Sequence, residues 1–288
     1  MLRDRLRIAL LLKTLILTAT AVPAYAHHEA LFGPQSSAVL SPGSFLSAQI
    51  FDRQKGGDDE RWRETTTVFS AGLQPFKRPL SFAVVVPVTF ASGLNDSSHH
   101  GFEDAVVSAR YRISADRLAT SLGLDETYVM GVGGLELPTG TLDHPFGRGS
   151  AGEIAAGLVG IEKRPIALIG YAYYHHTNSY RGTRPSGNVF AGGGVAWTPI
   201  DDDAAGKMFS LQLGLSHERT FASEENAIPD VDSGSSGTFV HPGVVASATR
   251  HLQFFALVSL PVHQAWRSLE DRQRFRLALG TIFILGPR

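Results

Sequence analysis

The 288-residue sequence contains no cysteine. This absence excludes a disulfide framework, a thiolate metal site and a lipid anchor on an N-terminal cysteine. Charged residues make up only 18% of the chain, and the formal net charge is −1, whereas soluble domains usually carry about 25% charged residues. Because there is no excess of positive charge, nucleic acid is not expected as a partner.

Long hydrophobic runs are equally scarce, and only the N-terminus carries one. Three arginines precede an apolar stretch at 8–22, and an A-x-A cleavage pattern ends at Ala26. This order predicts a secretory signal peptide over 1–26, cleaved before His27, because the stretch is too short for a membrane anchor and ends in Pro23 and small residues. The mature chain is therefore expected to be exported without a spanning helix.

What the sequence does contain is alternation, with apolar residues at every second position in twelve runs from residue 44 onward. These runs are 44–54, 64–74, 79–91, 102–113, 127–137, 151–162, 165–177, 186–198, 206–219, 238–249, 251–264 and 272–285. They are 11 to 14 residues long, whereas soluble strands are most often about 5–6 residues and transmembrane strands about 9–11. An even number of strands also suits a closed bacterial barrel, because both chain ends then emerge on the periplasmic side.

The last run shows why one face of each strand is expected to meet lipid. One face carries Phe275, Leu277, Leu279, Thr281, Phe283 and Leu285, and the other begins with Arg274, Arg276, Ala278 and Gly280. We expect this final strand to pair with the first strand near 45–51 and so to close the barrel.

The predicted connections alternate in length, as outer-membrane barrels require. The longer ones fall at 55–63, 92–101, 138–150, 178–185, 220–237 and 265–271, on the expected outer side. One connection on the periplasmic side, 114–126, is also long, and we expect one or two helical turns within 115–124.

Polar residues on the inner faces of the strands are candidates for the lining of a pore. Charged residues occur in the middle of a membrane-spanning strand only where their side chain faces water or pairs with another charge. The pore-lining candidates are Arg110, Arg112, Gln212, Gln253, Arg274 and Arg276. The irregular segment 27–43 is expected to be a lead-in that lies in the lumen as a partial plug.

Histidine pairs raise the question of a transition metal. His27 and His28 would follow the cleavage site, where the free α-amine adds a third nitrogen, and His99 and His100 lie in a predicted outer loop. Such nitrogens suit Cu(II) or Zn(II). The alternative is that they are polar rim and loop residues, and no other cofactor is expected.

The sequence indicates no catalytic residues. The Gly-x-Ser-x-Gly motif is absent, and the Gly-Ser-Ser-Gly stretch at 234–237 belongs to a flexible loop rather than a nucleophile elbow. His217 and His241 lie on adjacent predicted strands and could meet, but such histidines are more often lumen or rim residues. We therefore do not expect an enzyme.

Several short stretches follow a known pattern. Residues 101–112 read Gly-Phe-Glu-Asp-Ala-Val-Val-Ser-Ala-Arg-Tyr-Arg, residues 134–140 read Gly-Leu-Glu-Leu-Pro-Thr-Gly, and His241-Pro242-Gly243 and Leu260-Pro261-Val262 occur near the end. They resemble motifs of the phenol degradation meta-pathway (MetA-pathway) family of proteobacterial outer-membrane β-barrel proteins. The resemblance implies a twelve-stranded barrel that passes small molecules, in some cases aromatic compounds. It implies no catalytic residue.

The end of the chain departs from the usual outer-membrane pattern. Such proteins usually finish on an aromatic residue that the barrel-assembly machinery reads, whereas here Gly286-Pro287-Arg288 follow Leu285. Phe283 is the nearest aromatic residue that could take this role.

Together these observations predict an all-β protein, a single closed antiparallel transmembrane β-barrel of about 12 strands over 44–288 in the cell outer membrane. The expected partners are outer-membrane lipid and lipopolysaccharide, the barrel-assembly machinery and a small-molecule solute. The favoured function is a channel for passive uptake or efflux of small solutes, including hydrophobic or aromatic compounds. Two alternatives stay open: a transition-metal-binding outer-membrane protein and a soluble periplasmic β-protein.

Overall fold

The computed structural model describes residues 44–56, 61–75, 79–94, 97–141, 149–202, 205–231, 233–267 and 272–285. The expected signal peptide at 1–26 and the lead-in at 27–43 lie outside the described residues. Within these ranges, no helix is long and apolar enough to cross a membrane.

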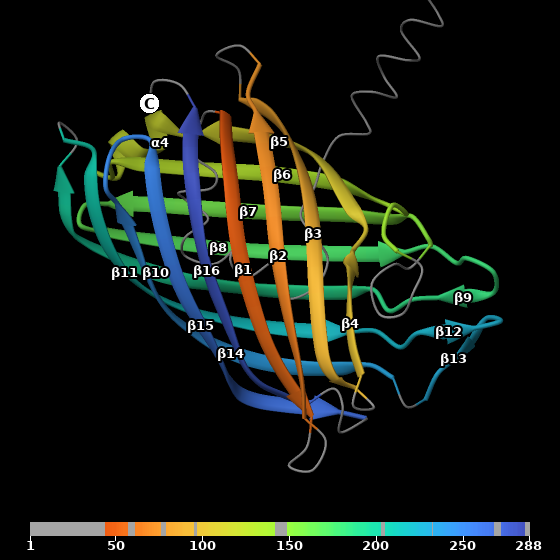
Figure 1. The fold of residues 1–288 in the computed structure, drawn as a ribbon. Coiled ribbons are helices and arrows are strands. Elements are labelled where there is room, and N and C mark those ends of the chain that lie inside the picture. The colour runs from red at the N-terminus through yellow and green to blue at the C-terminus, as the bar shows by residue number, and fades with distance from the viewer. Residues whose placement is uncertain are drawn as a thin grey trace, which may run out of the picture.

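The long strands form one closed antiparallel sheet, seen from the side in Figure 1. They are β1 Ser44–Gly56, β2 Arg61–Leu73, β3 Leu80–Leu94, β4 Ser97–Phe102, β5 Ala105–Ser114, β6 Glu126–Leu137, β7 Gly152–Lys163, β8 Ile166–Thr177, β10 Asn188–Asp202, β11 Lys207–Thr220, β14 Ser235–Ser247, β15 Leu252–Trp266 and β16 Gln273–Leu285. β4 and β5 share one position in the ring, because the two halves of β3 pair with β4 and β5 in turn. The ring therefore has twelve positions, and the predicted twelve-stranded barrel is confirmed.

The break between β4 and β5 lies opposite Pro87. A proline has no backbone N–H and cannot donate to the strand ladder from the middle of a strand. The neighbouring chain accordingly leaves the ladder at Glu103 and Asp104, where the Glu103 N–H donates to the Pro87 carbonyl at 3.1 Å. Regular pairing resumes on the other side of the break.

The predicted outer loop at 92–101 was wrong. β3 continues to Leu94, which pairs with Ser97 at the start of β4. Polar residues in this stretch suggested a loop, but the backbone pairing extends both strands beyond the alternating apolar pattern.

The barrel closes where the sequence predicted. β1 and β16 pair antiparallel, with Phe45 opposite Ile284 and Phe51 opposite Ala278. Both ends of the described chain therefore lie at the same end of the barrel, as an even number of strands requires.

The two ends of the barrel differ in their connections. At one end, short turns join the strands, and the one longer connection contains the helix α4 Asp116–Ser121, which confirms the helical turns expected there. At the other end, two loops form a small sheet from β9 Thr183–Arg184, β12 Glu224–Glu225 and β13 Ile228–Pro229. Figure 1 shows α4 and this small sheet at opposite ends. We call these ends the turn end and the loop end; short turns are typical of the periplasmic side and longer loops of the outer side.

Large apolar side chains cover the outer face of the wall. Exposed examples occur on most of the long strands and include Leu46, Ile50, Phe69, Val84, Phe90, Tyr111, Val129, Val159, Leu168, Leu211, Leu213, Leu215, Phe254, Leu260, Leu279 and Phe283. A soluble monomer rarely exposes a contiguous apolar surface of this extent. The belt therefore meets lipid, and the alternative of a soluble periplasmic protein is not supported.

Because the outer apolar belt contacts lipid, a charge placed in it is expected to lower the free energy of unfolding. Leu213 lies mid-strand on β11 and is 52% exposed. We expect Leu213→Arg to lower the free energy of unfolding in liposomes by about 2–4 kcal/mol, because an arginine near the bilayer midplane loses its hydration. Chemical denaturation monitored by tryptophan fluorescence measures this.

Ile228→Arg provides the matched control. Ile228 is 70% exposed but lies in the small sheet, away from the barrel wall. Its replacement is expected to leave stability unchanged. Equal effects of the two substitutions would contradict a lipid-facing belt.

Candidate functional site in the barrel lumen

The six predicted pore-lining residues lie on or near the inner side of the wall. Arg110, Gln212, Gln253 and Arg276 are each at most 7% exposed. Arg112 is half-buried, with an ion pair to Glu126 and its guanidinium 4.0 Å from the centre of the Tyr128 ring. Arg274 is half-buried at the loop end, where its Nε donates to the Gly56 carbonyl at 3.4 Å.

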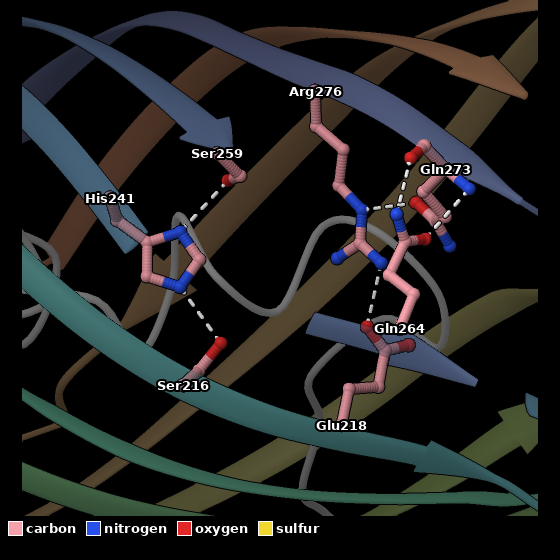
Figure 2. A network of polar contacts seen from close by, with 7 residues as sticks. All are labelled: Ser216, Glu218, His241, Ser259, Gln264, Gln273 and Arg276. Carbon is pink, nitrogen blue, oxygen red and sulfur yellow. Dashed lines mark hydrogen bonds and ion pairs between the residues drawn. The ribbon is translucent and has the colours of Figure 1, made fainter. Parts of the chain in front are cut away.

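Arg276 is the centre of a polar network near the loop end, shown in Figure 2. Its Nη2 lies 2.7 Å from Glu218 Oε2, and its Nε donates to Gln273 Oε1 at 2.5 Å. The guanidinium also lies 4.2 Å from the centre of the Phe239 ring. Arg276 on β16 thus reaches Glu218 on β11 across the inner faces of β14 and β15, over an aromatic ring that supports the cation.

Two like charges are neighbours in this region, because Arg53 on β1 lies directly opposite Arg276. Like charges in directly opposed strand positions repel each other. Each arginine has its own carboxylate on the far side: Arg53 forms a buried ion pair with Glu64 on β2, and Arg276 pairs with Glu218. The result is a row in which two neighbouring arginines are flanked by one carboxylate on each side, so their charges are balanced and no positive patch forms.

His241 forms a second part of the network. Hydrogen bonds join its Nε2 to Ser216 Oγ at 2.7 Å and its Nδ1 to Ser259 Oγ at 2.9 Å, as Figure 2 shows. His241 is 1% exposed. The adjacent His217 is exposed and bonds to Thr238 instead, so the two histidines that could have met point to opposite sides of the wall.

On another part of the wall, Glu136 on β6 and His175 on β8 are joined across β7. Their Oε2 and Nε2 atoms are 3.0 Å apart, and both side chains are buried. Between them lies Gly152, where an added Cβ would be 2.7 Å from each of these two atoms. The glycine therefore leaves the space through which the pair forms. The side chains from Arg53, Glu64, Glu136, His175, Ser216, Glu218, His241, Ser259 and Arg276 together make up what we call the polar ring.

Apolar side chains line much of the remaining inner wall. We call this set the inner apolar band; it comprises Phe45, Phe51, Val68, Ala83, Val85, Val106, Met130, Val132, Ile154, Leu158, Ile169, Tyr171, Tyr173, Phe190, Val245, Phe255, Leu257, Ala278, Ile282 and Ile284. Strand β11 contributes none of them: of its inner positions, Met208 is partly buried and packs against the band, and the others are Ser210, Gln212, Gly214, Ser216 and Glu218. Apolar side chains therefore come from most strands of the ring, beside buried polar side chains on many of the same strands, and they are fewest on β11.

The candidate metal ligands are not brought together in the described residues. His27 and His28 lie outside them. His99 and His100 lie in β4 rather than in a loop, and the His100 ring stacks on Phe90 with 6.1 Å between ring centres. No group of three or more His, Asp or Glu residues within the described ranges is placed to hold a metal ion.

Sequence reasoning missed most of the polar ring, namely Arg53, Glu64, Glu136, His175, Ser216, Glu218 and Ser259. The signal for Arg53 and Glu64 was present, because both are charged residues in alternating runs, as Arg276 is. The pairs Glu136–His175 and Arg276–Glu218 were not accessible in this way, since their partners lie on strands that are not adjacent.

The space at Gly152 gives a prediction about stability. We expect Gly152→Ala to displace Glu136 or His175 and to lower the free energy of unfolding by about 1–3 kcal/mol, because a buried polar pair loses its hydrogen bond. Gly131→Ala is the control, since a Cβ at Gly131 meets nothing within 4 Å. Denaturant titration of both variants tests the difference, and equal stabilities would contradict the role given to Gly152.

Comparison with known proteins supports the fold. No protein-family model matches the sequence, and no curated protein matches it. Among solved structures, an outer membrane channel from Pseudomonas putida F1 superimposes with a TM-score of 0.63 at 12% identity, over 84% of this chain and 95% of that one. The β domain of the Bordetella autotransporter BrkA gives a TM-score of 0.51 at 12% identity, over 84% and 99%. The chain therefore has the fold of outer-membrane β-barrel proteins, and its closed, lipid-facing wall belongs in the outer membrane.

Proposed function

We propose that this protein is a passive outer-membrane channel for small solutes that carry an apolar or aromatic group. The observation that supports this most directly is the inner apolar band. Barrels of general porins have polar interiors, whereas here most strands contribute apolar side chains to the inner wall beside their polar ones. The band side chains pack against one another and are each at most 8% exposed, so a solute that passes displaces them and enters an apolar environment, which gains about 25 cal/mol per Å² of its own apolar surface.

The charges of the polar ring support an uncharged solute. Arg53 pairs with Glu64, and Arg276 pairs with Glu218. Because each of these cations has a carboxylate beside it, these pairs add little net field that would favour ions of one sign.

The turn half of the lumen offers places for a solute's polar group. In the described part of the chain, Ser210 Oγ, Gln212 Oε1 and Gln253 Oε1 are buried and have no hydrogen-bond partner. Ser210 and Gln212 line a cavity of about 90 Å³ together with Ala196 and Val245. A hydroxyl group on a solute could donate to these oxygens while its ring contacts the apolar side chains.

We also propose that the chain belongs to the MetA-pathway family. Two of the stretches that resemble this family contact each other: the Gly140 N–H donates to Asp104 Oδ1 at 2.8 Å, and the Ala105 N–H donates to Thr139 Oγ1 at 2.9 Å. An added Cβ at Gly140 would lie 2.9 Å from Asp104 Oδ1, which gives both motifs a structural reason. The barrel-assembly machinery and lipopolysaccharide are the further partners proposed with this function.

Liposome swelling with a phenyl glycoside and a disaccharide of similar size tests the channel. We expect the aromatic glycoside to enter faster. The double substitution Val68→Thr/Val106→Thr replaces two inner methyl groups with hydroxyls at nearly constant volume. At about 0.8 kcal/mol for each apolar carbon lost, we expect it to lower the preference for the aromatic glycoside over the disaccharide about tenfold.

The matched control is Val84→Thr, which makes the same change on the outer face, where Val84 is 41% exposed. It is expected to keep the preference of the wild type. A disaccharide that enters as fast as the aromatic glycoside, or a preference that survives the inner double substitution, would refute the apolar route.

A further inference from the structure

A cleft at the loop end is not used by the proposed channel. It has a volume of about 450 Å³ and lies between the ends of β11, β14 and β15 and the loop that follows β11. Its lining comprises His217, Arg219, Thr220, Phe221, Ala222, Ser233, Gly234, Ser235, Ser236, Ala265, Trp266 and Arg267. We call it the rim cleft.

The rim cleft is basic. Arg219 lies 5.8 Å from the centre of the Phe221 ring, and Arg267 Nη1 donates to the Val231 carbonyl at 3.0 Å. Neither guanidinium has a carboxylate partner in the described part of the chain, and the described lining contains no Asp or Glu. A third guanidinium, that of Arg272, lies 5.6 Å from the Trp266 ring.

The hydroxyl groups and the aromatic ring of the cleft complement this charge. Thr220, Ser233, Ser235 and Ser236 bring hydroxyls to the lining, and Trp266 brings an apolar ring with a donor N–H. Arginine forks and hydroxyl donors are the groups that bind phosphate oxygens. The volume is in the range of pockets that hold small organic ligands, so a phosphorylated sugar unit fits better than an ion alone.

The cleft lies at the edge of the lipid-facing belt. On the outer face of β11, Leu211, Leu213 and Leu215 are exposed in the belt, and His217 is the next outward residue. His217 pairs with Thr238, which in turn pairs with His263, so polar residues continue this edge across three strands. The cleft therefore lies at the depth of lipid headgroups, on the side that carries the longer loops.

We propose that the rim cleft binds the phosphorylated sugar headgroup of lipopolysaccharide, the anionic glycolipid of the outer leaflet. Arg219 and Arg267 pair with a headgroup phosphate, the hydroxyls of Ser235 and Ser236 donate to its remaining oxygens, and Trp266 packs against the sugar. The acyl chains then run along the exposed leucines of β11. This inference rests on the proposed placement of the barrel in the outer membrane, with the loop end on the outer side because it carries the longer loops, but not on the solute or on conduction.

The test uses the full mature chain, purified in a zwitterionic detergent and freed of bound lipopolysaccharide. Binding of diphosphoryl lipid A is measured by titration calorimetry for the wild type and for Arg219→Ala/Arg267→Ala. We expect the double substitution to weaken binding at least about tenfold, because two charge-assisted contacts are lost. Heat-modifiable gel migration establishes that each variant is folded.

The control removes the same charge elsewhere. Arg117 is exposed in α4 at the turn end, and Lys207 is exposed at the start of β11. Arg117→Ala/Lys207→Ala is expected to bind lipid A as the wild type does. Equal weakening in both double variants, or no weakening in either, would overturn the proposal.

Two competing ligands, phosphatidylglycerol and inorganic phosphate, distinguish binding of lipopolysaccharide from binding of another anionic lipid or of free phosphate. We expect phosphatidylglycerol to bind more weakly than lipid A and inorganic phosphate at millimolar concentration not to displace it. Phosphatidylglycerol that binds as tightly would indicate a site for any anionic lipid, and displacement by phosphate would indicate a site for the free ion; both results overturn the glycolipid assignment. Liposome swelling with the same variants measures solute uptake, so a failure of the channel proposal is distinguished from a failure of the lipid-binding proposal.

Discussion

The structure depends on one constraint, that every backbone N–H and C=O inside a bilayer must find a partner in the protein. A sheet meets this constraint only when it has no free edge, and the pairing of β1 with β16 removes the last one. The length of the strands and their even number follow from it. Even the interruption at Pro87 conforms, because the Glu103 N–H donates to the Pro87 carbonyl across the break.

Once the backbone is satisfied, the two faces of each strand are free to differ. The outer face must be apolar wherever it meets lipid, but the inner face has no such requirement. Buried charges are tolerated there because each has a partner, as with Arg276 and Glu218. The inner wall can therefore combine apolar side chains, paired charges and hydrogen-bonded histidines on the same strands whose outer faces are apolar.

The sequence was sufficient to predict those features of the fold that depend on the local alternation of apolar and polar residues. The twelve positions of the barrel, the closing contact near Phe45 and Phe51, and the inward orientation of Arg276 follow from a period of two and from strand length. Contacts that skip strands were not accessible, because they depend on the curvature of the wall. Arg276 reaches Glu218 across two strands, and Glu136 reaches His175 only because Gly152 has no side chain. The small sheet of the loops also carries no periodic signal, since its strands have two residues each.

The polar groups of the lumen divide into two sets, and this division indicates where a solute would be recognised. Near the loop end, His241 bonds to Ser216 and Ser259, and Arg276 bonds to Glu218 and Gln273, so a solute that binds there must displace existing contacts. Toward the turn end, the side-chain oxygens of Ser210 and Gln212 have no partner among the described residues. A solute hydroxyl that donates to these oxygens breaks no hydrogen bond within the protein. The free energy gained from the new hydrogen bond is therefore not reduced by the loss of an existing one. In the proposed channel, the paired end therefore acts mainly as a neutral entrance, and selection among solutes depends on the apolar band and the oxygens of β11.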